Sequence, residues 1–436
     1  CLGCDRRIVR KGGLVMLAQR QALRRQPEFL KLWAGQTVSQ FGSGITGSAL
    51  PLTAVLVLGA SATQMGLLVA AEAAPFALFG LFAGVWVDRL RRRPLMIWAD
   101  LGRALLLLSI PLAFLLGRLQ IAQLFLVAAL MGVLTVLFDV AYQSFLPGLV
   151  PPEQFPAASS RLAASSAAAE VVTPGLAGVL VQVWSAPLTL VLDALSFLCS
   201  AGSVTLIQTA ERSAPRSVRG GVLRDLREGL HFVGGSPLLR AFAAYTTTSS
   251  FFGNWIGALY VLYGLSTLGL GPVLLGLTVG VGGMSNLLGT FLVGPITRRL
   301  GVAPSIFTVL AIGSVTTFLI PLAHGPVLLG FGLLALCQAF DAGQPIYAVN
   351  ALSIRQSLTP PRLLGRVNAA YHVLEGGVGP LGAVVGGILG GSIGVRPTLF
   401  LAACGCAASI LWLVFSPLRT LRYLPTLIDG EAAPAF

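Results

Sequence analysis

The sequence predicts an all-α polytopic membrane protein with twelve transmembrane helices in two pseudo-symmetric six-helix bundles. Hydrophobic residues make up 55% of the 436 residues, which is enough for about twelve helices of the roughly 20 residues that cross a ~30 Å hydrocarbon core. Charged residues make up only 10%, whereas a soluble chain carries about 25%. These proportions exclude both a soluble multidomain enzyme and an intrinsically disordered protein.

The hydrophobic runs locate the twelve spans, with boundaries good to about ±4 residues. The expected spans are 31–58, 64–87, 94–117, 122–146, 158–183, 186–208, 238–264, 271–293, 304–323, 326–350, 367–391 and 396–417. The expected domains are a cytoplasmic N-terminal segment (1–30), an N-terminal bundle (31–208), a charged cytoplasmic linker (209–237), a C-terminal bundle (238–417) and a cytoplasmic tail (418–436).

The positive charges predict the orientation of the chain. Lys and Arg number 29 against 16 Asp and Glu, and nearly all of them fall before the first span, in every second connection, or after the last span. Only Arg118 and Arg396 fall in the opposite set of loops. By the positive-inside rule, both termini are expected in the cytoplasm. The basic balance is therefore topological information, and no nucleic-acid partner is expected.

The two halves of the sequence predict an internal duplication. Residues 84–91 (GVWVDRLR) match residues 294–301 (GPITRRLG) at an offset of 210, and the same offset carries Pro94 onto Pro304 and Pro151 onto Pro361. Two repeats of six spans in parallel orientation are the arrangement of one large transporter fold.

The connection between spans 2 and 3 resembles the signature of the major facilitator superfamily. That signature is a glycine followed at fixed spacing by an aspartate, an arginine, a second glycine and two basic residues. Arg91 stands at the second glycine position, which the second half keeps as Gly301. The matching residues are Gly84, Asp88, Arg89, Arg92 and Arg93. This resemblance implies the major facilitator fold and transport by alternating access.

Several stretches resemble the bacterial exporter branch that includes macrolide efflux pumps and the enterobactin exporter. They are 29–33 (FLKLW) leading to 40–43 (QFGS), 100–104 (DLGRA), 143–147 (QSFLP), 193–197 (DALSF) and 363–367 (LLGRV). The resemblance implies a multi-pass protein of the bacterial inner membrane that exports amphipathic or hydrophobic, drug-like molecules. The alternatives are a siderophore or metal-related exporter, an uptake transporter of the same fold, a membrane subunit of an ATP-driven complex, and a membrane receptor.

The resemblance also implies a gating cluster that holds the two halves together in the outward-facing state. It assigns Asp88 to the start of span 11 and Arg92 to Asp139 near the inner end of span 4. Plain topological charge would explain the arginines equally well. It explains Asp139 less well, because an unpaired carboxylate inside a span costs several kcal/mol.

Acidic residues inside the spans predict proton coupling. Removal from water favours the neutral form of a carboxyl group, so an acid near the midplane can load and release a proton as the cavity alternates. The candidates are Glu170, Glu72, Asp341 and Glu375, with His372 one turn before Glu375; each could instead be a packing residue. Asp100 and Arg103 are expected to form a structural salt bridge, and Asp193 is expected to be a helix-packing residue.

Scattered polar and aromatic groups predict a substrate cavity, although such residues are also ordinary packing groups. The candidates that could contact substrate are Gln36, Gln40, Tyr142, Gln143, Asn254, Tyr347 and Asn350. Glycine and proline clusters in spans 5 and 11 predict bendable helices, because proline leaves a backbone carbonyl free. These residues are Pro174, Gly175, Gly379, Pro380 and Gly382.

Catalytic and metal functions are not expected. The only lysines, Lys11 and Lys31, do not stand in a nucleotide-binding Gly-Lys-Ser/Thr motif, and no metalloprotease or serine-hydrolase motif is present. Only three histidines occur, which disfavours a metal site. The expectations are therefore no enzyme activity, no cofactor and no nucleotide. The expected partners are a small-molecule substrate, protons and the lipid bilayer, and the expected state is a monomer.

Overall fold

The computed structural model describes residues 26–87, 90–208 and 221–420, and within these residues every regular element is a helix. The α-helices are α2 (Pro27–Leu56), α3 (Ala62–Val87), α4 (Arg92–Leu115), α5 (Ile121–Phe145), α6 (Phe155–Trp184), α7 (Ala186–Thr205), α8 (Val222–Gly235), α9 (Pro237–Leu262), α10 (Pro272–Leu300), α11 (Val302–Thr317), α12 (Leu319–Leu322), α13 (Val327–Ala339), α14 (Gly343–Leu358), α15 (Leu364–Ser392), α16 (Val395–Ser409) and α17 (Leu411–Val414). A π-turn, η3 (Tyr263–Thr267), continues α9, and 3₁₀ turns occur at η1 (Leu146–Gly148), η2 (Pro152–Gln154), η4 (Phe340–Ala342), η5 (Pro361–Leu363) and η6 (Pro417–Thr420).

Ten of the described helical segments are long and apolar enough to cross a membrane. Three of them are interrupted spans, formed by α11 with α12, by α13 with α14, and by α16 with α17. Helices α2 and α9 are as long, with 30 and 26 residues, but carry more polar side chains. Counting these two gives the predicted twelve spans, and the all-α, twelve-helix prediction is confirmed.

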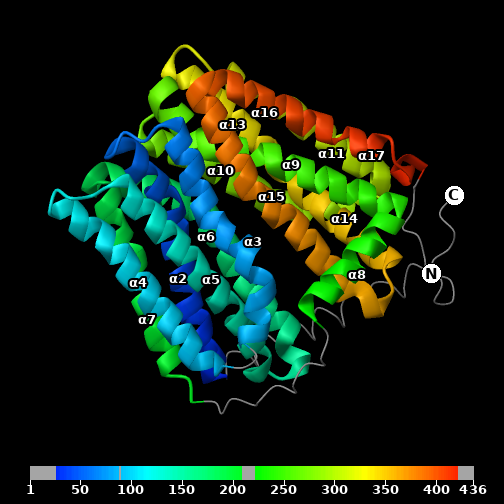
Figure 1. Ribbon diagram of the computed structural model, residues 1–436, viewed down its shortest axis with the longest axis horizontal. Coiled ribbons are helices and arrows are strands. Elements are labelled where there is room, and N and C mark those ends of the chain that lie inside the picture. The colour runs from blue at the N-terminus through cyan, green and yellow to red at the C-terminus, as the bar shows by residue number, and fades with distance from the viewer. Residues whose placement is uncertain (1–25, 88–89, 209–220, 421–436) are drawn as a thin grey trace, which may run out of the picture.

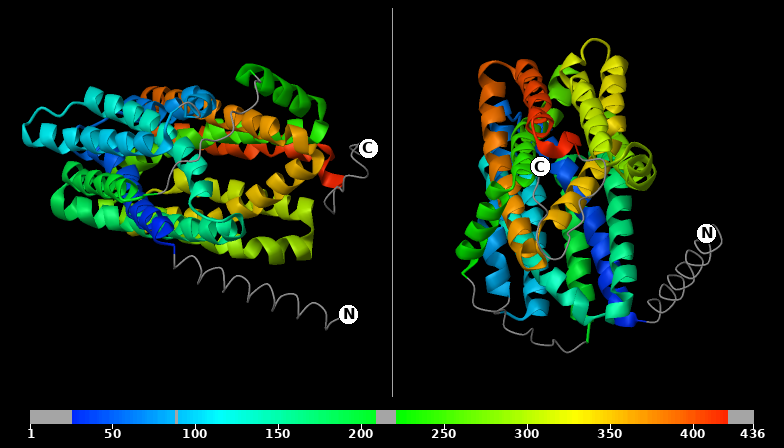
Figure 2. Two further views of the ribbon diagram at one scale, coloured as in Figure 1. Left: turned by 90° about the horizontal axis from the view of Figure 1, so that it is seen from below. Right: turned by 90° about the vertical axis from the view of Figure 1, so that its right-hand side faces the viewer.

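The spans form two halves, α2–α7 and α9–α17, that lie side by side (Figures 1 and 2). We name the two ends of the molecule by their charge. The arginine-rich end carries Arg92, Arg299 and Arg362, and the arginine-poor end carries the loops at Arg118 and at the start of α16. In Figure 1 the two halves cross near the arginine-poor end and diverge toward the end that carries α8.

The buried apolar clusters show where the halves join. A large cluster at the arginine-poor end contains side chains from both halves, including Met65 and Leu124 of the first and Leu262 of the second. At the arginine-rich end each half has its own cluster, around Phe29 in the first half and Phe242 in the second. The structure is therefore closed at the arginine-poor end.

Glycines allow the close approach of the two halves at that end. In the contact between α3 and α15, a Cβ atom added to Gly387 would lie 2.8 Å from the Gly66 Cα atom. In the contact between α6 and α10, Gly178 faces the backbone of Pro272 and Gly276 faces the carbonyl of Pro174. Helices in a membrane associate through such small residues because lipid supplies no hydrophobic driving force between them.

Replacing Gly387 by alanine is expected to destabilise this closed state by about 1–3 kcal/mol, because the added methyl group has no space beside Gly66. Gly377 is the matched control, since a Cβ atom there meets nothing within 4 Å. Alanine at Gly377 should be neutral or stabilising, because alanine is the better helix former by about 1 kcal/mol. Thermal unfolding of both variants in detergent measures the difference, and equal melting temperatures would contradict the close-contact assignment.

Part of the segment expected as a charged linker forms helix α8. Its acids pair with one arginine of α15: Arg366 Nε lies 2.9 Å from an oxygen of Asp225, and Arg366 Nη1 lies 2.6 Å from an oxygen of Glu228. The backbone of Gly229 lies against the Arg366 carbonyl. Helix α8 is thus held against the start of α15 in the second half.

Candidate functional site

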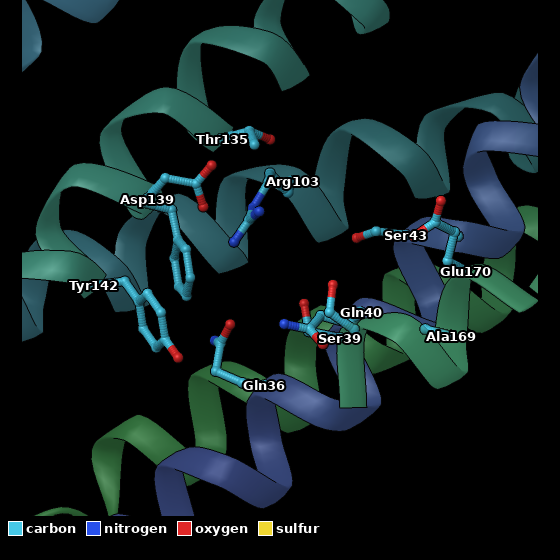
Figure 3. Close-up of a pocket in the computed structure, with 13 residues that line it drawn as sticks. Gln36, Ser39, Gln40, Ser43, Arg103, Thr135, Asp139, Tyr142, Ala169 and Glu170 are labelled. Atoms are coloured by element: carbon cyan, nitrogen blue, oxygen red, sulfur yellow. The ribbon is translucent and has the colours of Figure 1, made fainter. Parts of the chain in front are cut away.

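A cavity of about 460 Å³ lies within the first half. We call it the central cavity; α2, α4, α5 and α6 supply its walls (Figure 3). Its lining combines apolar surface with hydroxyl and amide groups from α2 and three charged residues, Arg103, Asp139 and Glu170. The lining residues are Gln36, Ser39, Gln40, Ser43, Gly44, Arg103, Thr135, Phe138, Asp139, Tyr142, Ser166, Ala169 and Glu170.

Arg103 is the one cation among the residues that line the central cavity. Its guanidinium pairs with Asp100 one turn earlier on α4, and the two side chains are only 5% and 0% exposed. The rings of Phe138 and Phe197 lie 4.4 and 4.2 Å from the guanidinium carbon. The predicted salt bridge is confirmed, but Arg103 also borders the cavity, which sequence reasoning did not anticipate.

Asp139 lies on the wall opposite α2, and Figure 3 shows its carboxyl group turned toward Arg103. The side chain is exposed to the cavity. The family resemblance paired Asp139 with Arg92, but here Arg92 Nη1 donates to the Ser144 carbonyl oxygen at 2.8 Å. Arg93 donates to the carbonyls of Val204 and Thr205 on α7.

Gly84, Asp88 and Arg89 are the remaining members of the predicted gating cluster. Gly84 belongs to α3, while Asp88 and Arg89 lie outside the described residues. The family resemblance implied that the complete cluster holds the two halves together in the outward-facing state.

Glu170 links the two halves. It lies on α6, and its Oε1 atom accepts a hydrogen bond from Asn286 Nδ2 of α10 at 3.2 Å. Glu170 borders the central cavity and also a second space of about 340 Å³, which we call the bridging cavity. The bridging cavity also contains Asn286, Gln338 and Asp341 of the second half. The structure therefore brings together Glu170 and Asp341, two of the four acids proposed for proton coupling.

The other two acids lie in separate cavities. Glu72 borders a space of about 270 Å³ inside the first half, which we call the side cavity. Glu375 borders a space of about 170 Å³ in the second half together with Tyr347, Tyr371 and Arg355. His372 is exposed one turn before Glu375 and is not among the residues lining that space.

Four of the seven predicted substrate-contacting residues border a cavity. Gln36, Gln40 and Tyr142 border the central cavity, and Tyr347 borders the cavity of Glu375. Gln143 is exposed and borders neither.

Two predicted substrate residues of the second half take part in helix packing. Asn350 is 4% exposed and exchanges hydrogen bonds with Thr297 of α10. Asn254 donates to the Ser250 carbonyl and lies against Gly379.

The glycines and prolines expected to bend the helices lie inside α6 and α15, which continue through them as single helices of 30 and 29 residues. Their small size is used for contacts with the next helix: Gly382 lies against the carbonyl of Phe251, and the Pro174 carbonyl lies against Gly276.

Arg103, Asn286 and Gln338 are among the cavity residues that were not anticipated from the sequence. Asn286 and Gln338 are isolated amides within apolar stretches, and that interruption was the available signal. Polar side chains are costly in a span unless they have partners or border water.

Two six-helix halves that meet around polar cavities within the membrane define a membrane transporter. The chain belongs to the Major Facilitator Superfamily, whose family profile matches residues 32–383.

Named relatives agree with this assignment. Macrolide efflux protein A of Streptococcus pyogenes is 24% identical over 85% of this chain and 91% of its own length. The multidrug efflux pump Tap of Mycolicibacterium fortuitum is 29% identical over 87% of this chain and 92% of its own length. Among solved structures, the nucleoside transporter NupG in its D323A form superposes with a TM-score of 0.71 at 11% identity, covering 89% of this chain and 99% of its own. The chain is thus a multi-pass membrane transporter and not an enzyme.

Proposed function

We propose that this protein is a proton-coupled exporter of amphipathic or hydrophobic organic molecules, acting as a monomer in the bacterial cytoplasmic membrane. The observation that carries the proposal is the position of Glu170, an acid between two cavities whose hydrogen-bond partner belongs to the opposite half. Any movement that separates α6 from α10 must break this contact. The charge of Glu170 is therefore coupled to the relative position of the halves.

The lining of the central cavity supports an amphipathic substrate. Amide and hydroxyl groups of α2 lie across the cavity from the Tyr142 ring, and the Phe138 ring also lines the cavity. This combination suits molecules with both polar and apolar surface. The names of two relatives, a macrolide efflux protein and a multidrug efflux pump, support the same substrate class and the direction of transport.

The charge distribution supports a cytoplasmic location for the arginine-rich end. With that orientation, the closed arginine-poor end faces outward, and the conformation described above is the inward-facing state. Alternating access then consists of opening the glycine-mediated contacts between α3 and α15 and between α6 and α10, while the arginine-rich end closes.

Cysteine labelling tests the orientation. Single cysteines beside Arg118 and Arg396, in a background without the six native cysteines, should react in intact cells with a membrane-impermeant maleimide. Cysteines beside Arg91 and Arg299 should react only after the cells are opened. The reverse pattern would overturn the orientation and the assignment of the inward-facing state.

Transport in inverted membrane vesicles tests the function. Vesicles from a host without its own efflux pumps, carrying this protein, should accumulate a radiolabelled macrolide when their interior is acidified. A protonophore should reduce accumulation to the level of vesicles without the protein. Accumulation that is unchanged by the protonophore would contradict proton coupling, and accumulation no greater than in empty vesicles would contradict the substrate class.

A further inference from the structure

Asp193 is a buried acid that the proposed mechanism does not use. It lies on α7 with no exposed surface, and its Oδ1 atom accepts a hydrogen bond from Ser196 Oγ at 2.8 Å. Its Oδ2 atom is buried and, within the described part of the chain, has no hydrogen-bond partner. Asp193 borders the side cavity, where the buried Thr46 hydroxyl lies beside it.

The helices around Asp193 supply little positive charge. Helix α4 contributes Asp100 and Arg103, and α3 contributes Glu72 across the side cavity. Helices α2 and α5 contribute no charged group to the walls of this cavity, since their polar groups there are hydroxyls. The remaining charged groups of the neighbouring spans point elsewhere: Arg161 lies over the Trp33 ring, Glu170 bonds to α10, and Asp139 borders the central cavity.

Arg103 cannot serve as a full counter-ion for Asp193. It is the one cation lining the side cavity, and its charge is already engaged by Asp100 and by the rings of Phe138 and Phe197. An ionised carboxylate buried without its own counter-charge costs several kcal/mol even after relaxation. A proton on Oδ2 removes this cost and turns the unpartnered oxygen into a donor that can reach the Thr46 hydroxyl.

Arg103 lies between two acids of the first half, Asp193 and Asp139. The central and side cavities share only Ser43, Arg103 and Thr135 among their lining residues. Asp193 lies seven residues into α7, about 10 Å from its arginine-poor end, at the helical rise of ~1.5 Å per residue. Asp139 lies six residues before the arginine-rich end of α5, on the other side of Arg103.

We propose that Asp193 is a second proton-binding group, placed on the arginine-poor side of Arg103 and reached through the side cavity that it shares with Glu72. When the proton leaves Oδ2 for water in this cavity, the carboxylate that remains attracts the Arg103 guanidinium. This attraction weakens the ion pair between Arg103 and Asp100. The proposal extends the proton coupling proposed above, but its test needs no transported drug.

Infrared spectroscopy of the whole protein in lipid tests this site directly. A protonated carboxylic acid has a carbonyl stretching band that a carboxylate lacks. At neutral pH the wild type should show this band, and isotopic labelling of the aspartate carboxyl groups should shift it. A protonated band that does not shift would belong to glutamate and would overturn the proposal.

Variants assign the labelled band to one residue. Asp193→Asn should remove about half of it or more, while the matched change Asp139→Asn, at an acid exposed to the central cavity, should leave it in place. If Asp193→Asn does not fold, Asp193→Glu should move the band from the labelled aspartate to the unlabelled glutamate position. A labelled band that survives either change at Asp193, or that disappears in Asp139→Asn, overturns the assignment.

The infrared and transport results separate the two proposals. The labelled band together with no proton-driven macrolide transport would count against the proposed function and leave the proton site at Asp193 intact. Proton-driven macrolide transport without the labelled band would count against the proton site at Asp193 and leave the proposed function intact.

Discussion

Replacing Arg103 by alanine is expected to lower the free energy of unfolding by about 3–5 kcal/mol, because it leaves the Asp100 carboxylate buried without its partner. Asp100 has no exposed surface, and Arg103, whose guanidinium packs against the Phe138 and Phe197 rings, is its partner in the ion pair. Transport should fall with stability, since Arg103 also borders the central cavity. Unfolding in mixed micelles, followed by circular dichroism, measures the loss.

Two further variants isolate the electrostatic part of this effect. Arg118→Ala removes an exposed arginine from a loop and should change stability by no more than about 0.5 kcal/mol. The double variant Asp100→Asn with Arg103→Met leaves no buried charge and should recover at least about half of the loss, as replacement of whole buried ion pairs does elsewhere. An Arg103→Ala protein as stable as Arg118→Ala would show that the ion pair does not hold the first half together.

The Glu170→Gln protein is expected to lose gradient-driven export by about tenfold or more while keeping exchange of substrate in the absence of a gradient. Glutamine keeps the size of the side chain and an oxygen that can accept the hydrogen bond from Asn286. What it removes is the ability to gain and release a proton. Proteoliposomes assayed with an imposed pH gradient and with none separate coupling from binding.

Glu153→Gln is the matched control, because Glu153 is an exposed acid of the same half outside the cavities. It should transport at the wild-type rate in both assays. If Glu170→Gln does the same, Glu170 is a packing residue. Asp341, which borders the bridging cavity from the second half, then becomes the next acid to replace.

The sequence alone determined the class, the number of spans and the duplication. A span needs about 20 apolar residues because every backbone group in lipid must be satisfied within its own helix. This requirement is local, so the spans can be predicted from the composition and from the hydrophobic runs. Helices α2 and α9 were located in the same way, from the hydrophobic runs at 31–58 and 238–264.

Helix α8, in the linker, was not predicted, because hydrophobic runs do not reveal a helix outside the spans. The segment 209–237 was interpreted as a charged linker because the hydrophobic pattern stops there. Leu226, Phe232 and Val233 of α8 nevertheless pack against the second half. The same stretch supplies the acids that pair with Arg366. A short amphipathic helix is stabilised by its tertiary contact and not by its own composition.

Only the tertiary structure decided which polar residues face a cavity and which face another helix. Asn350 and Gln40 were equivalent candidates in the sequence, yet Asn350 bonds to Thr297 inside a helix contact, whereas Gln40 borders the central cavity. Asp193, interpreted as a packing residue, borders the side cavity. The face that a side chain occupies depends on the rotation of its helix against its neighbours, and that rotation is set by contacts such as Gly66 against Gly387. These contacts join residues more than 300 positions apart in the chain, so no local pattern can report them.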